Sequence, residues 1–63
     1  MIRIEYRKEA HELPAPLTVA EALQQLGYSP EVFMAIRNGA LLDENELLQD
    51  GDVVRLVPKF AGG

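Results

Sequence analysis

The stretch Asp50-Gly51-Asp52-Val53-Val54-Arg55-Leu56-Val57-Pro58 decides the fold that this chain can adopt. Its first three residues are typical of a turn, and the β-branched, apolar run over residues 53–57 predicts a strand. Pro58 ends this strand because proline has no N–H to donate to a neighbour. The strand must find a partner elsewhere in the chain.

The start of the chain supplies the natural partner. Residues 1–7 alternate between apolar and charged side chains, so one side of a predicted strand carries Ile2, Ile4 and Tyr6. After a polar break, residues 10–13 predict a short strand that pairs back as a hairpin. We expect the first and last strands to lie side by side at the centre of one sheet.

A single helix is predicted over residues 19–26. Thr18 is a good N-cap, and Glu21 three residues later completes a capping box. Gly27 follows as a left-handed stop. One stripe of this helix is apolar and consists of Val19, Ala22, Leu23 and Leu26.

A second hairpin follows the helix. Residues 32–37 predict a strand that turns at Asn38-Gly39 into a short partner over residues 40–42. Residues 47–48 are expected to be buried beneath an acidic surface loop. The order strand, strand, helix, strand, short strand, strand predicts an α+β fold. This fold is a β-grasp, with a mixed sheet of four to five strands and the main helix packed on one face.

Composition excludes several classes of function. The 63 residues make one small domain, and the absence of cysteine excludes disulfides, a cysteine nucleophile and thiolate metal sites. No apolar run could cross a bilayer and no signal peptide is visible, so we expect a cytoplasmic protein without a membrane partner. The formal net charge of −4 argues against a nucleic-acid partner.

No metal site or catalytic residue is predicted. His11 is the only histidine, and we interpret it as a solvated hairpin residue. The carboxylates of the acidic loop and turn do not follow the EF-hand spacing, so they are interpreted as a surface loop rather than a calcium site. These carboxylates are Asp43, Glu44, Glu46, Asp50 and Asp52.

We divide the chain into a β-grasp domain over residues 1–57 and a flexible tail over residues 58–63. Without a Cβ on Gly62 or Gly63, the tail could enter a narrow channel and present a carboxylate to another molecule. The alternative is an ordinary frayed chain end. Phe60 either packs on the edge of the sheet or contacts the partner's channel, and we favour the channel.

A docking face is predicted on the side of the sheet away from the helix. We expect Val32, Met34 and Ile36 to face the helix, as Val54 and Leu56 do on the last strand. The opposite alternation would place the predicted docking residues on the outside; these are Phe33, Arg37, Val53, Arg55 and Val57. The alternative is a mixed solvent face with scattered apolar residues.

The chain resembles the ubiquitin-like sulfur carriers of the ThiS/MoaD family, together with the Urm-type and archaeal small modifiers. The resemblance spans most of the chain in the family's order. It is carried by Thr18-Val19-Ala20-Glu21-Ala22-Leu23, Ala35-Ile36-Arg37-Asn38-Gly39, Leu48-Gln49-Asp50-Gly51-Asp52-Val53-Val54 and Ala61-Gly62-Gly63.

The resemblance implies a carrier protein that is not itself an enzyme and binds no cofactor. An E1-like adenylyltransferase of the ThiF/MoeB kind would use ATP to adenylate Gly63, with Phe60, Ala61 and Gly62 inserted in its active site. A cysteine desulfurase or rhodanese-like protein would supply sulfur and leave a thiocarboxylate on Gly63. The acceptor would be thiazole synthase, the large subunit of molybdopterin synthase or a tRNA thiolase. The short length fits the thiamine-type carrier and the small prokaryotic modifiers better than the usually longer molybdopterin subunit.

Two other functions stay open. The activated Gly63 could instead be captured by lysine amines, which would make the chain a ubiquitin-like protein modifier. The chain could also be a binding module whose glycines are incidental.

Overall fold

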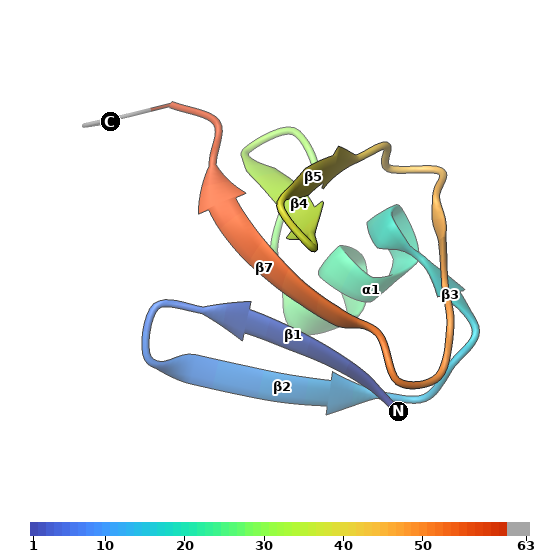
Figure 1. Ribbon diagram of the computed structural model, residues 1–63. Helices are drawn as coiled ribbons and strands as arrows, with labels where there is room; N and C mark the ends of the chain where they lie inside the picture. The colour runs from blue at the N-terminus through green and yellow to red at the C-terminus, as the bar shows by residue number, and fades with distance from the viewer. Residues whose placement is uncertain (61–63) are drawn as a thin grey trace.

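The computed structural model describes residues 1–60, which form a five-stranded sheet with one helix packed against it (Figure 1). The sheet has the strand order β2-β1-β7-β4-β5, and β3 and β6 form a separate two-stranded sheet. The elements are β1 (Ile2–Tyr6), β2 (Glu9–Leu13), β3 (Leu17–Thr18), α1 (Val19–Leu26), β4 (Phe33–Arg37), β5 (Ala40–Leu42), β6 (Leu47–Leu48) and β7 (Val53–Pro58).

The first and last strands lie side by side, as predicted. β1 and β7 run parallel, with Arg3 opposite Val53 and Glu5 opposite Arg55. β4 pairs with the other edge of β7 and runs antiparallel to it. The mixed sheet and its single main helix confirm the predicted α+β fold of the β-grasp type.

The helix begins and ends where its capping residues predict. The Glu21 N–H donates to Thr18 Oγ1 at 3.1 Å, and the Thr18 N–H donates to the Glu21 carboxylate at 2.9 Å, which completes the capping box. Gly27 has a φ of 84° and closes the helix by donating to the Gln24 carbonyl. Local sequence alone was sufficient to place this helix.

The segment before β7 contains a short strand that the sequence did not predict. Leu47–Leu48 forms a short antiparallel pair with Leu17–Thr18, and of the two leucines only Leu48 is buried. Carbonyls of the preceding acidic loop accept hydrogen bonds from the N–H groups of Val19 and Ala20, each at 3.0 Å. The acidic loop therefore closes the first turn of α1, where backbone donors have no partner within the helix.

The core lies between α1 and the helix-facing side of the sheet. Its residues come from the helix, from β1, β2, β4 and β7, and from the short strand β6, and no polar side chain is buried among the described residues. The core consists of Ile2, Ile4, Leu13, Val19, Ala22, Leu23, Ala35, Leu48, Val54 and Leu56.

The predicted orientation of β4 is wrong. Ala35 is only 2% exposed and lies directly opposite the buried Leu56, so both side chains point toward the helix. Phe33 and Arg37 share this side because side chains two residues apart on a strand face the same way. Met34 and Ile36 therefore point outward, while Val32 precedes the strand and is exposed.

The ordered strand also extends past the predicted domain boundary at residue 57. Pro58 is paired opposite Phe33, and the Lys59 N–H donates to the Val32 carbonyl at 2.7 Å. The hydrogen-bonded body therefore reaches Lys59. The predictions for Ala61, Gly62 and Gly63 lie outside the described residues.

Candidate functional site

The chain leaves the sheet from its central strand. β7 is paired to β1 as far as Arg55 and to β4 as far as Pro58, so the last part of β7 is held by β4 alone. Phe60 lies two residues beyond the end of β7 and is 68% exposed. Its contact with a partner stays a prediction.

The sheet carries an apolar strip on the side away from α1, which we call the outer face. Cross-strand pairing places Met34 opposite Val57 and Ile36 opposite Arg55, and β5 adds Leu41 opposite Ile36. Leu41 is 66% exposed and Val53 is 50% exposed. The strip consists of Met34, Ile36, Leu41, Val53 and Val57, with Arg55 among them.

The edge of the outer face nearest β2 is charged instead of apolar. Arg3 Nε donates to the Glu5 carboxylate at 2.8 Å, and Arg3 also lies 3.9 Å from the Glu12 carboxylate. These pairs are solvent-exposed, so they add little stability. They do neutralise Arg3, whereas Arg55 has no carboxylate partner within residues 1–60.

Only part of the predicted docking face is assembled by the fold. Val53, Arg55 and Val57 lie together on the outer face, as expected from the alternation along β7. Phe33 and Arg37 lie on the opposite side and have structural contacts there. The residues that the sequence analysis missed are Met34, Ile36 and Leu41; the Asn38-Gly39 turn, which sets the register of this hairpin, was the one available signal.

Phe33 belongs to an aromatic cluster beneath the sheet. Its ring packs edge-to-face on Tyr6 and Tyr28, with centroids 5.1 Å from each. His11 approaches the same cluster, with its ring 6.4 Å from Tyr28. His11 is therefore half-buried beside aromatic rings and less solvated than predicted.

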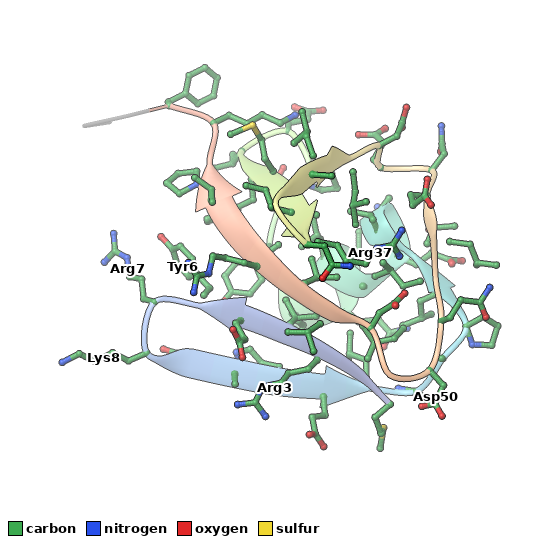
Figure 2. All side chains as sticks on the ribbon, in the orientation of Figure 1. Arg3, Tyr6, Arg7, Lys8, Arg37 and Asp50 are labelled. Atoms are coloured by element: carbon green, nitrogen blue, oxygen red, sulfur yellow. The ribbon has the colours of Figure 1, made fainter. Side chains whose placement is uncertain are left out.

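Arg37 ties the end of β4 to the loop before β7. Its guanidinium donates to the Asp52 carboxylate at 2.9 Å and to Glu46 at 3.4 Å. Figure 2 labels Arg37. The same Asp52 oxygen accepts the Gln49 N–H at 2.8 Å. This network closes the Asp50-Gly51-Asp52 turn, so Arg37 has a structural role.

Within residues 1–60 there is no group of three or more histidine, cysteine, aspartate or glutamate side chains that could hold a metal ion. None of the helices in this part of the chain has the length and apolar character needed to span a membrane.

The fold is shared with a solved structure. A solution structure of the N-terminal ubiquitin-like domain in the 4931431F19Rik protein is similar to this chain with a TM-score of 0.70 and 16% identity. The similarity covers 98% of this chain and 76% of that one, so the two share a ubiquitin-like β-grasp fold. None of the curated proteins matches the sequence.

The family follows from the sequence itself. The family model described as "ThiS family" matches residues 2–63, which is nearly the whole chain and includes Ala61, Gly62 and Gly63. The chain belongs to the ThiS family, and the predicted resemblance is confirmed. Members of this family are small carrier proteins.

Proposed function

We propose that this protein is a sulfur carrier whose Gly63 carboxylate is adenylated and converted to a thiocarboxylate. The observation that carries this proposal is the match of the ThiS family model through Gly63. The exposed apolar strip on the outer face supports it, because a carrier must dock on several enzymes in turn.

The chemistry requires activation of the tail. A carboxylate resists nucleophiles, and reaction with the α-phosphate of ATP converts it into an acyl-adenylate with release of pyrophosphate. A persulfide from a cysteine desulfurase or rhodanese-like protein then attacks the acyl carbon and displaces AMP. Attack of a second thiol on the resulting acyl disulfide breaks the S–S bond, leaving the thiocarboxylate on the carrier and a disulfide on the donor.

The body of the domain presents the tail and contributes no acid, base or nucleophile. Pairing of Pro58 with Phe33 and the hydrogen bond from Lys59 hold the base of the tail to the central strands. The outer face, with Arg55 and its apolar strip, is the proposed docking surface for an E1-like adenylyltransferase and for the sulfur-accepting synthase. We place this ATP-dependent chemistry in the cytoplasm, with thiazole formation for thiamine as the pathway.

Mass spectrometry of the protein isolated from its host tests the proposal. We expect a population heavier by the exchange of one oxygen for sulfur, and we expect deletion of Gly63 to abolish both this population and adenylation. The melting temperature should stay nearly unchanged, because the core residues all lie between Ile2 and Leu56. Full adenylation of the variant that lacks Gly63 would contradict the proposal.

Mass spectrometry also distinguishes the sulfur carrier from the alternative, a protein modifier. A protein modifier would leave branched Gly-Gly remnants on lysines of other proteins, without the sulfur-for-oxygen exchange on the carrier. Detection of these remnants alone would replace the sulfur-carrier proposal by conjugation through Gly63.

A further inference from the structure

The arginines and lysines of this protein fall into two groups. Arg3 and Arg37 form ion pairs with carboxylates. The remaining four have no carboxylate within 4.0 Å among residues 1–60, and all four are exposed. These four, which we call the basic rim, are Arg7, Lys8, Arg55 and Lys59.

The basic rim lies at the end of the molecule from which the tail departs. Because β1 and β7 are parallel, the turn after β1 and the end of β7 lie at the same end of the sheet. Figure 2 shows Arg7 and Lys8 projecting from that turn, with Asp50 at the opposite end of the molecule. The fold thus gathers cations that are up to 52 positions apart along the chain, from Arg7 to Lys59.

A groove connects the two halves of the rim. Pairing of β1 with β7 stops at Glu5 and Arg55, and the two strands separate beyond that point. The groove between them is lined by Glu5, Tyr6 and Arg7 from β1 and its turn, and by residues 55–58 of β7. Each wall carries a guanidinium without a carboxylate partner among residues 1–60, and that of Arg7 stacks on the Tyr6 ring at 5.3 Å.

The acidic residues are distributed differently. Asp50 and Asp52 precede β7 at the far end, where Asp52 and Glu46 bind Arg37. The carboxylates nearest the rim are Glu5, which pairs with Arg3, Glu9, which lies 3.4 Å from His11, and the exposed Glu31. A protein with a net charge of −4 therefore carries its unpaired cations around the base of the tail.

We infer that the basic rim docks on an acidic protein surface around the entrance of the channel that receives the tail. This inference rests on the proposed function. It predicts that the adenylating enzyme carries acidic side chains around the entrance of that channel. Nucleic acid and anionic lipid fit less well, because the acidic remainder of the surface would be repelled by an extended polyanion. The channel entrance of a protein is small enough to contact the basic rim without contacting the acidic remainder of the surface.

We expect the basic rim to affect how fast the carrier associates with the enzyme and how it is oriented on approach. Exposed charges at the border of an interface mainly raise the association rate, and salt screens this effect. The charge asymmetry would turn the tail end of the carrier toward the enzyme before contact. Maximum turnover depends on the seated tail and should not change with the rim.

The test uses the full chain and the adenylating enzyme of the same host, with carrier-dependent ATP–pyrophosphate exchange as the readout. Lys8→Gln combined with Lys59→Gln removes two rim charges and alters neither the outer-face strip nor the glycines. The matched control is Gln24→Glu combined with Gln25→Glu, on two exposed helix positions. Both double variants change the formal net charge by −2, from −4 to −6.

We expect the rim variant to lower kcat/KM about fivefold at low salt and less than about twofold at about 0.5 M salt, with kcat unchanged. The helix control should stay within about twofold of the wild type at both salt concentrations. An equal loss in both variants, or a loss that salt does not remove, would overturn the inference and leave the proposed function standing. Absence of exchange with the wild-type carrier would reject the proposed function and the inference together.

Discussion

The two faces of the sheet are built from alternate residues of the same strands, yet they differ in exposure. On β7, Val54 and Leu56 are buried against the helix, whereas Val53 between the turn and Val54 is half exposed. Apolar side chains on the inner face are therefore removed from water, whereas those on the outer face stay accessible to a partner. With the outer face as the proposed docking surface, we expect stability and recognition to change separately when one residue or its neighbour on β7 is substituted.

The largest effect is expected from truncation on the inner face. Leu56→Ala should lower the free energy of unfolding by about 2–5 kcal/mol, because it leaves a cavity in the core. Val53→Ala on the outer face of the same strand is the matched control and should cost less than about 1 kcal/mol. Urea unfolding followed by circular dichroism measures both, and equal losses would show that the two faces do not differ.

A polar substitution on the outer face should affect recognition more than stability. Ile36→Asp places a carboxylate directly opposite Arg55, where a cross-strand ion pair makes it tolerable, but it interrupts the apolar strip. We expect carrier-dependent ATP–pyrophosphate exchange to fall about tenfold in kcat/KM, equivalent to about 1.4 kcal/mol of transition-state binding. Unchanged exchange would show that this strip is not the docking surface.

Substitution of Arg37 tests whether its side chain stabilises the fold or contributes to docking. Arg37→Met removes the hydrogen bonds to Asp52 and Glu46, and we expect a loss of about 1 kcal/mol in unfolding free energy with exchange activity retained. Chemical denaturation and exchange kinetics are measured on the same preparation. Retained stability with lost exchange would instead support the docking role that the sequence predicted for this residue.

The smallest effect is expected at the cap of the helix that covers the inner face. Thr18→Ala removes the side-chain acceptor of the Glu21 N–H and should cost about 1 kcal/mol. Thr18→Ser keeps this acceptor and should cost less than half as much. Thermal unfolding of the two variants gives the difference, and equal melting temperatures would argue that the capping box contributes nothing.

Most of the fold could be predicted because its signals are local. The capping box with Gly27 defined the helix, Asn38-Gly39 defined a hairpin, and the alternation of Ile2, Ile4 and Tyr6 defined the buried side of β1. Each of these signals lies within a few residues of the structure it specifies. Pairing of the first strand with the last followed once both were identified.

The orientation of β4 could not be predicted in the same way. Residues 32–36 are all apolar, so their alternation contains no polar position that marks the solvent side. The orientation is set by pairing with β7, which places Ala35 opposite Leu56. The candidate docking face changed with it, from Phe33 and Arg37 to residues of the strip on the other side.

The sequence by itself determined the β-grasp fold, the helix and its caps, and membership of the ThiS family, because capping, turn and alternation patterns act over short distances along the chain. Only the tertiary structure decided which side of β4 faces outward and which cations surround the base of the tail. Both depend on strands that are distant in sequence and adjacent in space, so their physical cause is the pairing of β7 with β4 and β1.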